Sequence, residues 1–147
     1  FSRPGRWAPI IAALTTAVSD RLAPKLRDLL PDVNHALRRQ RDGADWLDGD
    51  SLLSALGGFY LLAAVRDCRD SLALNELFEE TWNRTGQSLD MHLTRNLDAL
   101  RDNPGDTIIE ARVEGGIKMA ELRFGPDYAM ILRQARDGVG TRSAASG

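Results

Sequence analysis

The chain has few of the residues that reveal the chemistry of a small protein. Its 147 residues include one cysteine, Cys68, and two histidines. A single cysteine excludes an intrachain disulfide and leaves the cellular compartment open. No apolar run reaches the roughly 18–20 residues that a transmembrane helix needs. Only two of the 19 basic residues are lysines, an arginine bias typical of GC-rich bacterial coding sequences.

Catalytic and metal-binding signatures are missing as well. The chain has neither a Gly-x-Ser-x-Gly turn nor a Gly-x-x-x-x-Gly-Lys phosphate loop. Asp45, Asp48 and Asp50 lie in one loop, but their spacing differs from that of an EF-hand and no glutamate completes it. His92 has no other metal-ligating residue four positions before or after it. We therefore predict no catalytic residue, no metal site and no cofactor.

What remains is the composition of an ordinary folded domain. Hydrophobic residues make up 43% of the chain, charged residues 27%, and the net charge is −2. A chain of this length buries about 70% of its unfolded surface, so we expect a hydrophobic core. We predict one helical bundle domain over residues 1–138 and a flexible tail or linker at 139–147, where small and polar residues dominate. Because the chain begins with Phe1, we expect it to be part of a larger bacterial protein.

The strongest pattern is an apolar stripe in the first quarter of the chain. Its members recur every three or four residues, which is the period of one face of an α-helix. The stripe keeps its phase through Pro24 and Pro31, although prolines normally end helices. It predicts a buried helical face that begins near Pro9, on a helix either bent at its prolines or divided into three short helices. The stripe consists of Trp7, Ile11, Leu14, Val18, Leu22, Leu26, Leu29, Val33 and Leu37.

The rest of the chain predicts further helices, giving a mainly α single-domain bundle of five or six helices. A helix at residues 51–68 is expected to be the most buried, because residues 52–65 are almost wholly apolar. Gly86 is expected to separate two helices that begin near Ser71 and at Ser88, because glycine often follows a helix end. The last helix is expected to end at Gly138.

The segment 107–124 permits two interpretations. Its apolar residues recur at helical spacing, but a helix would then contain Gly115 and Gly116, each costing about 1 kcal/mol relative to alanine. Apolar and charged residues also alternate before this glycine pair, which is typical of a β-hairpin. We favour the helix because strong helix formers follow the pair. In a helix the two glycines would allow another helix to approach closely, with Gly57 and Gly58 as the candidate partner surface.

Charge is distributed unevenly along the chain. Residues 1–41 carry a net charge of +5, and residues 42–147 carry −7. The basic segment could pair with the acidic remainder inside the fold, or it could face an anionic partner. Under the second hypothesis the contact residues are Arg38, Arg39, Arg41, Lys25 and Arg27.

Together these observations favour a non-catalytic targeting or protein-interaction module with a protein partner. Attachment to an anionic membrane surface through the basic cluster is one alternative. A small enzyme or regulator with dispersed site residues is another. Nucleic acid is not expected as a partner, because aromatic residues do not alternate with the basic ones. No motif identifies a family.

Overall fold

The computed structural model describes residues 4–41 and 43–146, with the side chains of residues 5–41 and 43–139. It contains five α-helices and, over these residues, no β-strand. The prediction of a mainly α single domain is therefore confirmed, and the segment 107–124 is a helix rather than a hairpin. The helices are α1 (Pro4–Leu37), α2 (Gly49–Cys68), α3 (Asn75–Asp102), α4 (Thr107–Phe124) and α5 (Pro126–Ser146).

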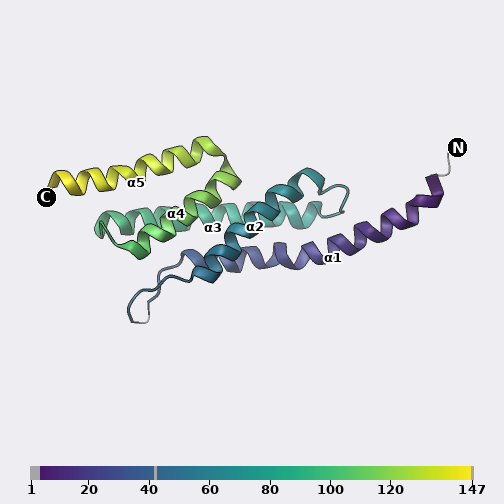
Figure 1. Ribbon diagram of the computed structural model, residues 1–147, viewed down its shortest axis with the longest axis horizontal. Helices are drawn as coiled ribbons and strands as arrows, with labels where there is room; N and C mark the ends of the chain where they lie inside the picture. The colour runs from purple at the N-terminus through teal and green to yellow at the C-terminus, as the bar shows by residue number, and fades with distance from the viewer. Residues whose placement is uncertain (1–3, 42, 147) are drawn as a thin grey trace.

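The helices form a bundle in which α1 and α4 lie on opposite sides of α2 and α3. Helix α1 packs on α2 and α3, while α4 packs on α3, α2 and α5. Figure 1 shows α1 along one edge of the bundle and α5 along the other, with the N-terminal half of α1 extending beyond its neighbours. Ion pairs from Arg133 to Glu121 and from Arg136 to Glu114 join α5 to α4. Most of the core lies among the first four helices, and α5, the outermost layer, adds Ala129 and Val139 to it.

There are five helices rather than six because Gly86 does not end a helix. Helix α3 runs through it without interruption. A Cβ atom at Gly86 would lie 2.7 Å from Nη2 of Arg123. That guanidinium lies 4.1 Å from the centre of the Trp82 ring and donates a hydrogen bond of 3.0 Å to the Trp82 carbonyl. Gly86 thus makes room for an arginine from α4, and the prediction of a helix end there is wrong.

The most buried helix is α4, and the prediction that it would be the helix at 51–68 is wrong. In α2, Leu53 is 71% exposed and Tyr60 is 62% exposed. The sequence of α2 is apolar on every side, so its pattern does not indicate which face a neighbour covers. The buried residues of α4 are Ile109, Arg112, Val113, Gly115, Gly116, Ile117, Met119 and Ala120.

Helix α2 also corrects the expectation about apolar runs. By length and composition it is the one helix of the described residues that could cross a membrane. In this structure α2 packs along α1 and α4. It directs Phe59 and Leu62 into the core of the bundle, where both side chains are almost fully buried.

The glycine pair of α4 lies where two other helices approach. A Cβ atom at Gly115 would lie 2.6 Å from Cδ1 of Leu52 on α2. A Cβ atom at Gly116 would lie 2.7 Å from Cδ2 of Leu93 on α3. The predicted close approach at these glycines is therefore confirmed.

The partner surface predicted for this pair is wrong. Gly58 faces α1, where an added Cβ would lie 2.5 Å from Cδ1 of Leu29. Gly57 faces open space. The two glycines of α2 therefore have different environments, and an added Cβ at either would not approach α4.

Helix α1 is continuous over 34 residues, with Pro9, Pro24 and Pro31 inside it. All three prolines are exposed. The backbone hydrogen bonds that they cannot donate are therefore missing on the solvent side of the helix and not in the core. Division into three short helices is therefore wrong, as is a start at Pro9, because α1 begins at Pro4. At the other end of the chain, α5 continues past Gly138 to Ser146, so the predicted helix end at Gly138 is also wrong.

Only the second half of the apolar stripe in α1 is buried. Leu26, Leu29, Val33 and Leu37 are each at most 1% exposed. The first half of the stripe projects beyond the bundle, as Figure 1 shows, and the prediction of one buried face along the whole helix is wrong. The exposed members are Trp7, Ile11, Leu14 and Val18.

Candidate functional site

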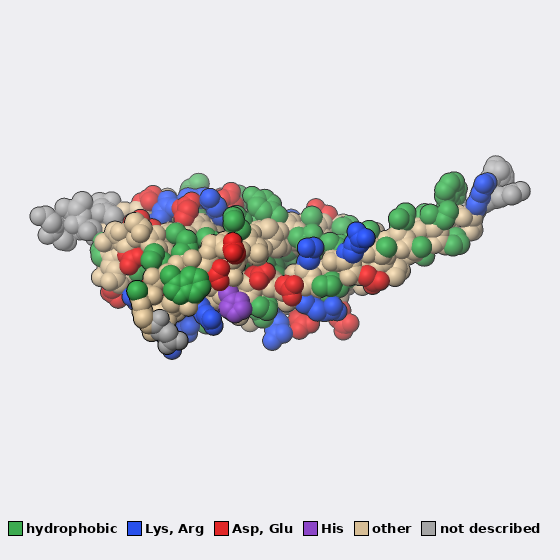
Figure 2. Space-filling view, turned by 60° about the horizontal axis from the view of Figure 1, so that its bottom comes forward, with side chains coloured by type: hydrophobic (Ala, Val, Ile, Leu, Met, Phe, Trp, Pro, Cys, Tyr) green, Lys and Arg blue, Asp and Glu red, His purple; other side chains and the backbone are tan. Residues whose placement is uncertain are grey.

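The first candidate surface is residues 5–18 of α1, which we name the arm. The hydroxyl of Ser19 donates a hydrogen bond of 2.6 Å to the carbonyl of Leu72, in the loop between α2 and α3. This bond marks the place where α1 joins the bundle. The arm beyond it is about 20 Å long at the rise of an α-helix. Figure 2 shows hydrophobic side chains gathered along this projecting segment.

The arm combines strong apolar character with exposure. Residues 7–18 contain no aspartate, glutamate, lysine or arginine. Their large hydrophobic side chains are between 43% and 61% exposed. Soluble proteins seldom leave a contiguous apolar surface of this kind uncovered unless it binds something. The exposed side chains are Trp7, Ile10, Ile11, Leu14 and Val18.

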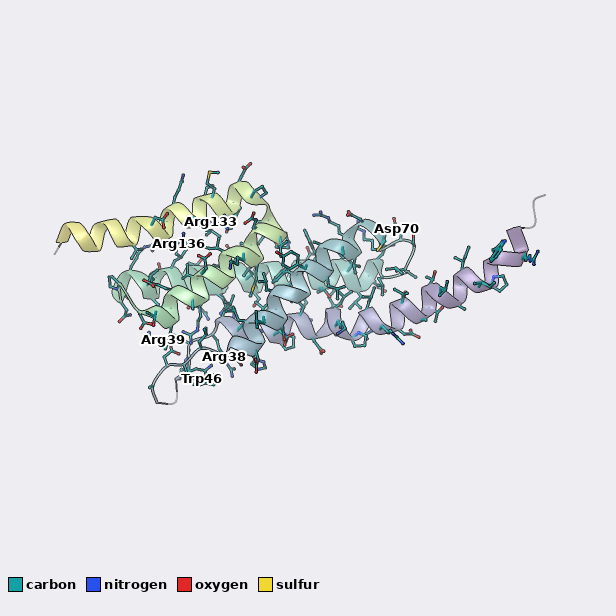
Figure 3. All side chains as sticks on the ribbon, viewed as in Figure 1. Arg38, Arg39, Trp46, Asp70, Arg133 and Arg136 are labelled. Atoms are coloured by element: carbon teal, nitrogen blue, oxygen red, sulfur yellow. The ribbon has the colours of Figure 1, made fainter. Side chains whose placement is uncertain are left out.

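The second candidate surface is a hollow of about 720 Å³, which we name the arginine hollow. It lies between the end of α1 with its following loop on one side and α3 on the other. Figure 3 shows Arg38 and Arg39 at this end of the bundle, with Trp46 in the same loop region. Four arginines line the hollow: Arg38, Arg39, Arg41 and Arg95.

The positive charge of the arginine hollow is not neutralised by ion pairs within the part of the chain that the structure describes. None of its four arginines forms an ion pair there, and neither does any other basic residue of the range 5–41. Internal pairing of the basic segment with the acidic remainder therefore finds no support. Elsewhere in the bundle seven arginines do have carboxylate partners, namely Arg66, Arg69, Arg84, Arg101, Arg112, Arg133 and Arg136.

Below the arginines a neutral polar network lines one wall of the hollow. The Oδ1 atom of Asn34 lies 3.0 Å from Nε2 of His92 and accepts a hydrogen bond of 2.6 Å from Ser88. Because an amide oxygen can only accept, Nε2 of His92 carries the proton. Asn96 donates hydrogen bonds of 2.8 Å to the carbonyls of Leu37 and His92. These bonds fix the end of α1 against α3.

His92 contributes no positive charge to this wall near neutral pH. Its burial lowers the pKa of the imidazole below its usual range, and the nearby guanidinium of Arg95 lowers it further. The wall is therefore neutral, while the rim of the hollow carries the four positive charges.

A partly buried ion pair holds the loop that carries Arg39 and Arg41. The carboxylate of Asp45 accepts two hydrogen bonds of 2.7 Å from the guanidinium of Arg112 on α4. The Arg112 side chain is 1% exposed, and it also donates a 2.7 Å hydrogen bond to the carbonyl of Trp46. The backbone N–H of Gln40 donates to the same carboxylate at 2.9 Å. The loop is thus fixed at both of its ends.

This ion pair shifts the titration of its acid. The hydrogen bonds from Arg112 lower the pKa of Asp45 to about 2, with a further contribution from the N–H of Gln40, although partial burial opposes them. No local sequence pattern indicates this pair. Arg112 is a lone charged residue beside apolar ones, and its partner stands 67 positions earlier.

The structure brings together some of the predicted contact residues and separates the others. Arg38, Arg39 and Arg41 line one hollow. Lys25 and Arg27 are exposed on α1, at least 11 residues before Arg38 and hence roughly 16 Å away along the helix, and they do not line it. The sequence does not indicate Arg95 as a contact residue, because it joins the cluster only through the packing of α3 against α1.

A second hollow, of about 910 Å³, lies between the turn after α3 and the helix α5. Two of its charged residues, Glu114 and Arg136, are paired with each other. No group of three or more histidine, cysteine, aspartate or glutamate side chains that could hold a metal ion occurs among the described residues. Comparison of the chain with known protein families, with curated proteins and with solved structures found no match.

Proposed function

We propose that this chain is a non-catalytic protein-interaction module that binds a protein partner through the arm. The observation that carries the proposal is the exposure of five large hydrophobic side chains on residues 7–18, which carry no charge. Burying such side chains contributes about 25 cal/mol for each Å² of apolar surface. A partner that covers the arm therefore gains binding free energy by burying apolar surface that the bundle leaves exposed.

The spacing of the exposed residues defines the kind of partner surface. Trp7, Ile11, Leu14 and Val18 lie at positions i, i+4, i+7 and i+11, on one face of the helix. Helices that bind in apolar grooves use anchors at this spacing. We therefore propose a partner with an apolar groove that receives the arm along about three turns. The bundle acts as the base that holds the arm in a helical state.

Site-specific photocrosslinking in the producing cell tests this function. A photoreactive amino acid in place of Leu14 is expected to form an adduct with a discrete protein. The matched control carries the same amino acid in place of Leu53, which is at least as exposed but lies on the bundle. The double variant Ile11→Ser with Val18→Ser is expected to abolish the adduct at position 14. Equal adducts at both positions, or none at position 14, would contradict the proposal.

The arginine hollow favours a second candidate, attachment to an anionic membrane surface. Basic residues near such a surface contribute about 1 kcal/mol each. Vesicles rich in phosphatidylserine are then expected to bind the protein at low salt and release it at high salt, whereas phosphatidylcholine vesicles do not bind it. Absence of binding to either vesicle at low salt rules this candidate out and leaves the protein partner.

A further inference from the structure

The arginine hollow carries an inference of its own, independent of the arm. We propose that it binds an acidic peptide segment in which an apolar side chain stands between carboxylates. Three features of the hollow point to this ligand: its charged rim, its apolar floor and its prearranged loop.

The rim presents positive charge on two opposite sides. Arg38, Arg39 and Arg41 come from the end of α1 and its loop, and Arg95 comes from α3. All four side chains are exposed and lack an ion-pair partner among the described residues. Guanidinium groups bind carboxylates through paired N–H donors. Charges placed on both sides of an opening fit a ligand that carries several separate anionic groups.

The hollow also has an apolar part, which we name its floor. Leu37, Met91, Ala99 and Ile109 line it. Leu37 and Ile109 are almost fully buried, so Met91 and Ala99 present its accessible apolar surface. Met91 is 41% exposed, and methionine adapts its shape to different apolar ligands. An apolar side chain between two carboxylates would reach this floor while its neighbours meet the rim. An entirely charged ligand would leave the floor unused.

The size and position of the charges argue for a peptide over a single small anion. A volume of about 720 Å³ is that of a site for a drug-sized ligand, far larger than a phosphate. The cationic side chains of the hollow all stand on its exposed rim, and its buried polar residues, His92 and Asn96, are neutral or bound to backbone. Such a wall offers no buried positive charge to a small anion.

Two residues of the loop that carries Arg39 and Arg41, Gln40 and Asp45, are held in place before any ligand binds. The hydrogen bonds of Asp45 to Arg112 and to Gln40 fix them against α4. Ordering a loop on binding lowers affinity, so a fixed loop retains more of the interaction free energy. The ion pair thus helps to position Arg39 and Arg41 without itself contacting the ligand.

Fluorescence anisotropy tests the proposal with a labelled Glu-Glu-Leu-Glu-Glu peptide at low salt. The double variant Arg38→Gln with Arg95→Gln is expected to bind it about tenfold more weakly. The control, Lys25→Gln with Arg27→Gln, removes the same charge from exposed positions outside the hollow and is expected to change the affinity less than about twofold. Met91→Ser is expected to weaken the binding of this peptide and to leave the binding of an all-glutamate peptide unchanged. Circular dichroism checks that each variant is folded.

Several outcomes would overturn the proposal. No anisotropy change with the intact protein at low salt is one, and an equal loss of affinity in the two double variants is another, because it would indicate attraction by net charge alone. Displacement of the peptide by an equimolar amount of inorganic pyrophosphate would show a small-anion site instead. The arm variant Ile11→Ser with Val18→Ser should bind the peptide unchanged, so failure here is distinguishable from failure of the proposed function.

Discussion

The two halves of α1 differ in environment although their sequences follow one pattern. Residues 22–37 and residues 5–18 both place large apolar side chains at three- and four-residue spacing. The first of these segments is covered by α2 and α3, and the second is covered by nothing in the described part of the chain. Helical periodicity therefore defines a face that needs a partner, but it does not say whether the partner is in the same chain.

The same contrast recurs in other parts of the molecule. In α2, Leu62 is fully buried whereas Leu53 is 71% exposed, on a helix that is apolar on all sides. Arg112 is buried against Asp45, whereas Arg38 is exposed without an ion-pair partner among the described residues. In each comparison the chemistry of the side chain is similar, and the neighbours supplied by the fold determine what it does.

The largest expected effect contrasts a leucine from each half of α1. Leu29→Ala removes a side chain that is 1% exposed and is expected to lower the free energy of unfolding by about 2–5 kcal/mol. Leu14→Ala removes the same atoms from the arm and is expected to change it by less than about 0.5 kcal/mol. Urea denaturation measures both values. Similar losses for the two variants would mean that the arm is covered within the protein itself.

A smaller effect contrasts two glycines. Gly116→Ala places a methyl group 2.7 Å from Leu93 in the core and is expected to cost about 1–3 kcal/mol. Gly57→Ala adds the same group in open space on α2 and is expected to stabilise the protein by up to about 1 kcal/mol through helix propensity. Thermal unfolding of the two variants measures both changes in stability, which are expected to have opposite signs. A stabilising Gly116→Ala would show that α4 does not lie this close to α3.

The smallest effect contrasts a partly buried acid with an exposed one. The pKa of Asp45 in the folded protein, about 2, lies below its usual value of 3.8, so its ion pair stabilises the fold fully above about pH 4 and loses this contribution as the pH falls toward 2. Asp45→Asn is expected to cost about 1–2 kcal/mol at pH 7, with the difference from the intact protein vanishing near pH 2. Glu80→Gln, in the exposed pair with Arg84, is expected to change stability by less than about 0.5 kcal/mol. A pH-independent effect of Asp45→Asn in urea denaturation is the result that contradicts this assignment.

Much of the fold could be predicted from the sequence, because local patterns govern helix formation. The helix at 107–124, the burial of Leu26 to Leu37 and the close packing at Gly116 all follow from periodicity and composition. Gly86 shows the limit of local signals. A glycine is typical of a helix end, but here its missing side chain admits Arg123 from a helix far along the chain.

The candidate surfaces were predicted only in part, for the same reason. The cluster of Arg38, Arg39 and Arg41 is visible because the three residues are close in sequence. Arg95 and the ion pair of Arg112 with Asp45 depend on contacts between distant segments, which no spacing rule reports. The sequence pattern places the arm in the core, because an apolar stripe on a helix is normally buried.

Amide hydrogen exchange along α1 tests most directly whether its two halves differ. Exchange is slow where opening a helix requires disruption of core packing, and fast where only solvent surrounds it. In the isolated protein, residues 5–18 are expected to exchange at least about a hundredfold faster than residues 26–37, although both are helical. Equal protection of the two segments, at a concentration where the protein is monomeric, would contradict the account, because it would mean that the arm is covered by its own bundle.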